Sequence, residues 1–149
     1  MPQSLVKILV HIVFSTKNRA DMIFPEIETE LYSYIHGIIE NNKAKLIIAN
    51  GTTNHSHFLI SLGRNDVREL IGDIKRDSSL WIKKKGDQFH DFYWQRGYGA
   101  FSIGQSQVPE VMRYIANQKE HHSKQTFEDE FREICQKYEV EIDERYCWD

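Results

Sequence analysis

The sequence is poor in cysteine and has no long apolar run. Cys135 and Cys147 are its only cysteines, too few for a disulfide framework, so we expect reduced thiols. The longest apolar run, residues 8–14, is interrupted by His11 and is far too short to cross a bilayer. The first residues, MPQS, lack the basic segment of a secretory signal. These features predict a cytoplasmic protein that does not span a membrane.

Several ligand-binding motifs are also missing. The chain contains no G-x-x-x-x-G-K-[ST] phosphate loop, no G-x-G-x-x-G dinucleotide loop, no H-E-x-x-H and no paired C-x-x-C. Their absence argues against a nucleotide-driven motor, a dinucleotide enzyme, a zincin and a zinc ribbon. No internal repeat or Pro/Ser-rich linker divides the 149 residues, so we predict one domain over residues 1–149.

Positive charge is not in excess. The 19 Lys and Arg residues are outnumbered by 22 Asp and Glu residues, which excludes a histone-like or uniformly basic nucleic-acid binder. The acidic charge is concentrated after residue 118, and a locally basic stretch precedes it at Lys75, Arg76, Lys83, Lys84 and Lys85. Such a stretch indicates either the solvated face of a helix or a track for a DNA backbone.

Hydrophobic spacing predicts alternating strands and helices. Short apolar runs indicate strands at residues 5–14, 45–49 and 56–62, a turn at Asn50-Gly51, and an interrupted strand across 92–95 and 100–103. Helical spacing predicts helices over 25–42, 67–86, from 106 or 107 onward, and 127–138. This order is the split βαβ, ferredoxin-like pattern. We therefore predict an α+β fold with helices on one face of an antiparallel sheet and the other face open for a site or partner.

The sharpest local feature is the pair His55 and His57. Alternate residues of a strand share one face, and Phe58 and Ile60 need the core, so both imidazoles are expected on the open face. Two neighbouring imidazoles can bind one divalent cation. The alternative is a pair of exposed histidines without a partner.

Tyr114 and Gln118 are four residues apart and are expected on one helical face. A nearby cation would favour the phenolate of the tyrosine and polarise a phosphate, and the glutamine carbonyl could be a third metal ligand. The alternative is that Tyr114 packs at a helix edge and Gln118 is solvated. His121 and His122 follow, and we expect a solvated helix end there.

Five segments together closely resemble one protein family: residues 11–19, 54–60, 78–82, 94–102 and 114–122, which read HIVFSTKNR, NHSHFLI, SSLWI, WQRGYGAFS and YIANQKEHH. The family is that of the HUH single-tyrosine transposases of bacterial and archaeal insertion sequences, with their REP-associated relatives. The resemblance extends over nearly the whole chain, in order and at similar spacing.

The resemblance implies a function. It places the family's metal-binding histidines on His55 and His57, its glutamine ligand on Gln118 and its nucleophile on Tyr114, with the tyrosine carried by the C-terminal helices. Such transposases use Mg²⁺ or Mn²⁺ to cleave and rejoin single-stranded DNA at hairpin-bearing ends through a 5′-phosphotyrosine, and they work as homodimers. No nucleotide cofactor and no membrane are implied, and the reaction takes place in a bacterial or archaeal cytoplasm, at the nucleoid. The imidazoles alone would equally suit Zn²⁺.

One position departs from the family. Ser56 stands where a hydrophobic residue is usual between the two histidines, and an unpartnered buried hydroxyl there would cost about 1–3 kcal/mol. An inactive, DNA-hairpin binding relative is therefore an alternative, and a ferredoxin-like metal or small-molecule sensor is a third. The residues expected to approach DNA are His11, Lys17, Arg19, Arg76, Lys83, Lys84 and Lys85.

Overall fold

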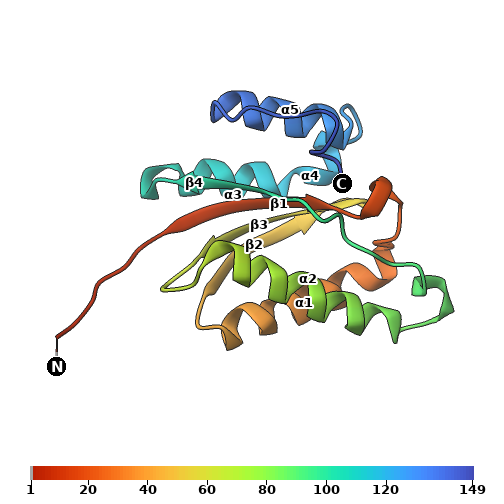
Figure 1. Ribbon diagram of the computed structural model, residues 1–149, viewed down its shortest axis with the longest axis horizontal. Helices are drawn as coiled ribbons and strands as arrows, with labels where there is room; N and C mark the ends of the chain where they lie inside the picture. Colours follow the sequence, from red (N-terminus) through yellow and green to blue (C-terminus); the bar gives the residue numbers. More distant parts are fainter. Residues whose placement is uncertain (1) are drawn as a thin grey trace.

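The computed structural model describes residues 2–149 and contains a four-stranded antiparallel sheet in the order β2-β3-β1-β4 (Figure 1). The strands are β1 (Leu9–Ser15), β2 (Lys45–Gly51), β3 (His55–Ser61) and β4 (Gly99–Ile103). Strand β1 lies in the interior of the sheet and pairs with both β3 and β4. The predicted ferredoxin-like, α+β fold is confirmed.

Two long helices cover one face of this sheet, as Figure 1 shows. Helix α1 (Pro25–Asn41) has proline in its first turn, and α2 (Val67–Lys83) begins after Asp66, whose carboxylate caps the backbone amide of Glu69. Ile12, Phe14, Phe58 and Ile60 of the strands pack against the apolar sides of these helices. The alternation predicted for the strand that carries His55 and His57 is therefore confirmed.

The C-terminal helices cover the other face of the sheet (Figure 1). They are α3 (Val108–Ala116), α4 (Gln118–His121) and α5 (Phe127–Lys137). We expected this face to be open, but its strands also present apolar side chains. Val13 packs with Phe131 of α5, and Leu59 packs with Ile115 of α3. A site on this face is consequently enclosed between the sheet and the C-terminal helices.

The described part of the chain also contains three short 3-10 helices: η1 (Lys17–Arg19), η2 (Asp87–Phe89) and η3 (Gln105–Gln107). The segment before β4 is less regular than predicted, with a single bridge between Thr16 and Trp94. The carbonyls of Gln95, Arg96 and Gly97 accept hydrogen bonds from the Lys75 ammonium. No helix among residues 2–149 is long and apolar enough to span a membrane.

Candidate active site

His55 and His57 lie side by side on β3, and both are fully buried. One ring nitrogen of each is already engaged. His57 Nδ1 lies 2.8 Å from His11 Nε2, and His55 Nδ1 lies 2.8 Å from Asn54 Oδ1. These contacts fix both rings and leave their Nε2 atoms directed toward the C-terminal helices.

His11 has a different place from the one that we expected. We counted it among the residues that approach DNA, but only 4% of its surface is exposed and its ring contacts that of His57. The cause is its position on β1, where it faces the same layer as Val13 and lies opposite Leu59 in the sheet. His11 orients His57 and does not face the solvent.

Tyr114 and Gln118 reach the same place from α3 and α4. The helix is interrupted at Asn117, which separates α3 from the four-residue α4. Gln118 is fully buried, and its Oε1 lies 3.0 Å from His55 Nε2. The centroid of the Tyr114 ring is 5.9 Å from that of His57. The predicted histidines, tyrosine and glutamine are therefore brought together within one chain.

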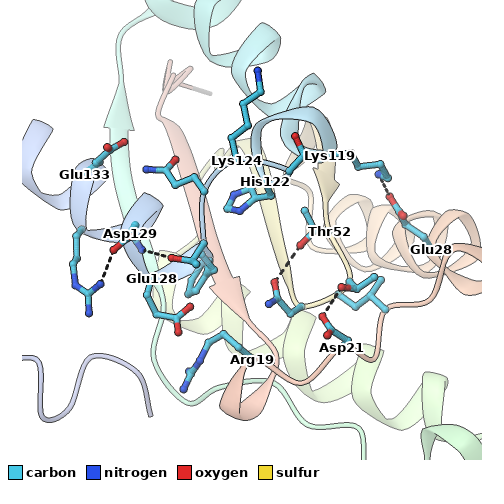
Figure 2. A pocket seen from close by; sticks show the side chains of 18 of the residues that line it. Arg19, Asp21, Glu28, Thr52, Lys119, His122, Lys124, Glu128, Asp129 and Glu133 are labelled. Atoms are coloured by element: carbon cyan, nitrogen blue, oxygen red, sulfur yellow. Dashed lines mark hydrogen bonds and ion pairs between the residues drawn. The ribbon is translucent and has the colours of Figure 1, made fainter.

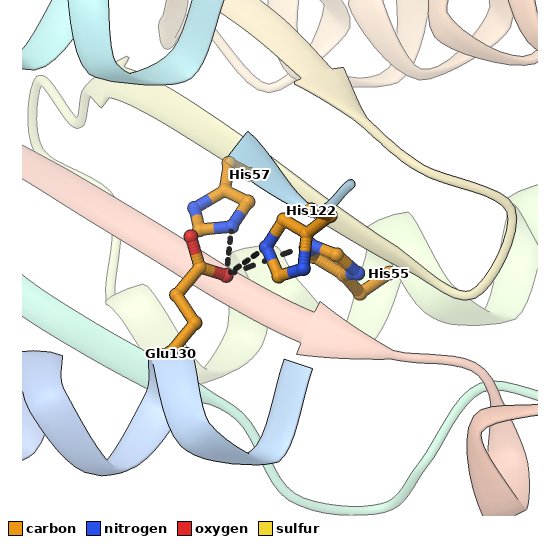
Figure 3. Close-up of side chains that lie close together, drawn as sticks. All are labelled: His55, His57, His122 and Glu130. Carbon is orange, nitrogen blue, oxygen red and sulfur yellow. Dashed lines mark hydrogen bonds and ion pairs between the residues drawn. The ribbon is translucent and has the colours of Figure 1, made fainter. Parts of the chain in front are cut away.

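Sequence reasoning missed Glu130, the acidic residue at the centre of this site. It comes from α5 and is 1% exposed. Figure 3 shows its carboxylate among three imidazoles. Its Oε1 lies 3.0 Å from His57 Nε2, 3.5 Å from His55 Nε2 and 2.8 Å from His122 Nε2. A signal existed in the sequence, because Glu130 lies between Phe127 and Ile134 on the apolar side of its helix.

The second oxygen of Glu130 faces the nucleophile candidate. Glu130 Oε2 accepts hydrogen bonds from the Tyr114 hydroxyl and, at 2.9 Å, from Gln118 Nε2. One carboxylate thus joins the imidazole cluster to the tyrosine.

His122 also belongs to the site, although we expected a solvated helix end. Its side chain is 8% exposed because the chain turns inward after α4, and its ring centroid is 4.2 Å from that of His55. His122 Nε2 lies close to Glu130 but is not aligned for a hydrogen bond, so this buried nitrogen has no partner among the described residues. His121 is more exposed, with its Nε2 3.9 Å from Glu130 Oε2.

Burial sets the protonation states of the site. It lowers the pKa of His55 to about 3, with a further contribution from His57, and that of His11 to about 3 in the same way. Burial alone would raise the pKa of Glu130, but the neighbouring His122 and His57 lower it below its usual range. Burial and the charge of Glu130 raise the pKa of Tyr114. The site therefore has neutral His55 and His11, an ionised carboxylate and a neutral phenol.

These properties fit a metal ion. One ligand atom from each of His55, His57, His122 and Glu130 lies within 4.8 Å of the others. Neutral imidazoles and an ionised carboxylate are the forms in which these side chains bind metals. The cluster can hold one ion.

A cleft of about 1230 Å³ opens beside the cluster, and His122 lies on its wall (Figure 2). Arg19, one of the residues expected to approach DNA, also lines it and donates to the Trp148 carbonyl at 2.6 Å. Lys17 is exposed nearby on η1, with its ammonium 5.8 Å from the centre of the Tyr93 ring. Acidic side chains such as Asp129 share the cleft, so its charge is mixed.

The remaining basic candidates lie on the other side of the molecule. Arg76 and Lys83 belong to α2, below the sheet in Figure 1, and Lys84 and Lys85 follow directly. Arg76 is paired with acidic neighbours on its own helix, and Lys85 is 3.2 Å from Glu30. The sheet separates this group from the histidine cluster, so the structure does not bring it to the site.

Comparison with known proteins identifies relatives. The sequence model of the family described as "Transposase IS200 like" matches residues 4–118. A protein of Deinococcus radiodurans R1, provisionally named a transposase, shares the fold at a TM-score of 0.61 and 17% identity over 79% of this chain and 98% of its own. A REP-associated tyrosine transposase bound to a REP hairpin matches at 0.63 and 15% identity, over 82% of this chain and 73% of its own. No curated protein matches significantly.

Proposed function

The chain belongs to the family of IS200-like transposases, and on this premise we propose that it cleaves and rejoins single-stranded DNA with Tyr114 as the nucleophile. The observation that carries the proposal is the convergence of the Tyr114 hydroxyl, Gln118 and the two β3 imidazoles around one carboxylate. These groups come from four elements: α3, α4, β3 and, for the carboxylate, α5. A tyrosine that only packed at a helix edge would not explain why these groups converge on its hydroxyl.

The proposed chemistry exchanges one phosphodiester for another. The Tyr114 hydroxyl loses its proton and its oxygen attacks the scissile phosphorus. The bond to the 3′ oxygen breaks, and that oxygen takes up one proton and leaves as a free 3′-OH, so the step neither releases nor consumes a proton overall. The 5′-phosphate remains on the tyrosine until a 3′-OH attacks it and releases the phenol. Because the phosphoester bond is conserved in both steps, no nucleotide cofactor is needed.

A divalent ion, Mg²⁺ or Mn²⁺ as the family resemblance implies, would offset charge on the phosphate and favour the phenolate. His55, His57 and Gln118 would face this ion. The neutral phenol of Tyr114, held by Glu130, would have to be released from that hydrogen bond before it attacks.

For the DNA we propose single strands with hairpin ends. A hairpin is the ligand of the REP-associated structural neighbour. Lys17 and Arg19 lie on the side of the molecule where the cleft opens, whereas Arg76, Lys83, Lys84 and Lys85 would contact a different part of the DNA. We also propose a homodimer that acts in the cytoplasm, although Tyr114 reaches the site of its own chain in this structure.

The alternative of a non-catalytic hairpin-binding protein has lost one of its two supports. It rested on the net negative charge of the chain, which remains, and on Ser56 as a buried hydroxyl without a partner. The Ser56 hydroxyl instead lies 2.9 Å from the hydroxyl of Tyr32 on α1. The substitution is therefore accommodated within the fold, and it leaves both histidines in place.

A covalent complex is the direct test. We expect a denaturing gel to show a protein–DNA band when the protein meets Mn²⁺ and a pool of single-stranded oligonucleotides with a hairpin and a randomised flank. Tyr114→Phe removes the attacking oxygen and should abolish the band. Tyr146→Phe, at an exposed tyrosine, is the matched control and should retain it. A band that persists in Tyr114→Phe would refute the assignment, and hairpin binding without a band would favour the non-catalytic alternative.

A further inference from the structure

We infer that His122 and Glu130 join His55 and His57 as ligands of one metal ion, and that this centre prefers a transition-metal ion such as Mn²⁺, Co²⁺ or Zn²⁺ to Mg²⁺. The inference deepens the proposed function, on whose metal site it rests. It adds two ligands to which the family resemblance assigns no role, and it places Gln118 beside the ion as a hydrogen-bond donor to Glu130. Both added ligands lie beyond residue 118, where the match to the family's sequence model ends.

The position of His122 is the first argument. Its imidazole is buried to more than nine-tenths, and its Nε2 atom points into the cluster, 2.8 Å from Glu130 Oε1 but not aligned with it for a hydrogen bond. A buried polar nitrogen without a hydrogen bond is unfavourable, because it has lost its hydrogen bonds to water. A metal ion shared with His55 and His57 would provide the missing partner.

The surroundings of the other ligands are the second argument. Metal-binding imidazoles usually have their second nitrogen held by a neighbouring group, which sets the ring orientation. His57 Nδ1 is held by His11, and His55 Nδ1 by Asn54. Both Nε2 atoms are thereby aimed at the cluster.

Glu130 is held in a corresponding way. Its Oε2 atom accepts hydrogen bonds from Tyr114 and Gln118, and its Oε1 atom faces the imidazoles (Figure 3). One oxygen is thus available to the ion, while the other ties the nucleophile to the same carboxylate. Glu130 would position Tyr114 beside the metal centre.

The donor set decides the class of metal. Mg²⁺ prefers oxygen ligands and retains several waters. Imidazole nitrogens suit Zn²⁺, Co²⁺ and other first-row transition metals, whose binding to nitrogen donors is much stronger. Three imidazoles with one carboxylate, enclosed beneath α3, α4 and α5, therefore favour a transition metal.

The test measures metal binding without DNA. We expect calorimetry to show one Co²⁺ per chain, with visible d–d absorption typical of nitrogen ligands, and no comparable binding of Mg²⁺. His122→Ala and Glu130→Gln should each lower the Co²⁺ affinity at least about tenfold and alter the absorption spectrum. His36→Ala and Glu26→Gln, both at exposed positions on α1, are the matched controls and should leave both unchanged.

The possible outcomes distinguish a failure of the four-ligand metal centre from a failure of the proposed transposase function. Unchanged Co²⁺ binding in folded His122→Ala, with loss in His57→Ala, would overturn the four-ligand centre but leave the transposase proposal intact. Mg²⁺ binding as tight as that of Co²⁺ would overturn the metal preference. Circular dichroism checks folding. If Glu130→Gln does not fold, His122→Ala decides the result, because His122 lies nearer the surface.

Discussion

At the scale of single residues, the contact between Ser56 and Tyr32 explains how this chain accommodates a serine where its family usually has a hydrophobic residue. Ser56, on β3, is fully buried, and within residues 2–149 its hydroxyl has the Tyr32 hydroxyl of α1 as its one side-chain partner. We predict that Tyr32→Phe destabilises the protein by about 1–3 kcal/mol, because it leaves the serine hydroxyl buried and unpaired. Urea unfolding followed by circular dichroism measures this change.

A double-mutant comparison isolates that hydrogen bond. Ser56→Ala in the Tyr32→Phe background removes the second hydroxyl and should recover part of the lost stability. Tyr34→Phe, at a partly exposed tyrosine of the same helix, should change the stability little. An equal loss from Tyr32→Phe and Tyr34→Phe would contradict the proposed role of the Ser56 contact.

The sequence predicts part of the site at this scale, whereas the roles of Glu130 and His122 depend on how segments distant along the chain pack together. The shared face of His55 and His57 follows from the two-residue period of a strand, which is a local property. Glu130 was missed because its role depends on how α5 packs over β3, a contact between segments about 75 residues apart along the chain. His122 was missed because the chain turns inward after a helix too short to show a pattern.

At the scale of elements, the β2–β3 hairpin positions His55. We predicted its turn at Asn50-Gly51, because that pair favours tight turns. The strand instead continues through both residues, with Gly51 opposite Ser56, and the turn lies at residues 52–54. Glycine is needed here for another reason: a Cβ atom at Gly51 would overlap the His55 carbonyl oxygen.

Gly51→Ala should therefore destabilise the protein by about 2 kcal/mol or more and displace His55, because backbone must move to admit the methyl group. Gly37→Ala is the matched control, since a Cβ there meets nothing within 4 Å in the middle of α1. That change should stabilise the protein by about 0.5–1 kcal/mol. Thermal unfolding compares the two variants, and a Gly51→Ala protein as stable as the parent would contradict the close approach.

At the scale of the whole molecule, the site depends on two helical layers on opposite faces of the sheet, α1 with α2 on one face and α3, α4 and α5 on the other. Strands and the α1–α2 layer form one core that the periodicity of the sequence predicted well. The layer above the sheet has two smaller apolar clusters, one with α5 and one with α3. Its position was not predictable, because an amphipathic helix does not reveal which of two partly apolar surfaces it covers.

The C-terminal segment holds this upper layer in place. Trp148 packs against Phe127 and Phe131 of α5, and its carbonyl accepts a hydrogen bond from Arg19 of η1. The next residue, Asp149, accepts a hydrogen bond from the Gly97 amide. Residues more than 50 positions apart thus fix the helix that carries Glu130.

We therefore predict that Trp148→Ala loosens α5 selectively and lowers stability by about 1–3 kcal/mol, because a partly buried aromatic contact is lost. Hydrogen exchange should accelerate in the amides of α5 while those of β1 and β3 remain protected. Tyr146→Ala, two residues away and largely exposed, is the control and should leave the exchange of α5 unchanged. Uniform acceleration over the whole chain would instead mean that α5 and the sheet unfold as one unit, so the C-terminal segment would not act on the site through α5 alone.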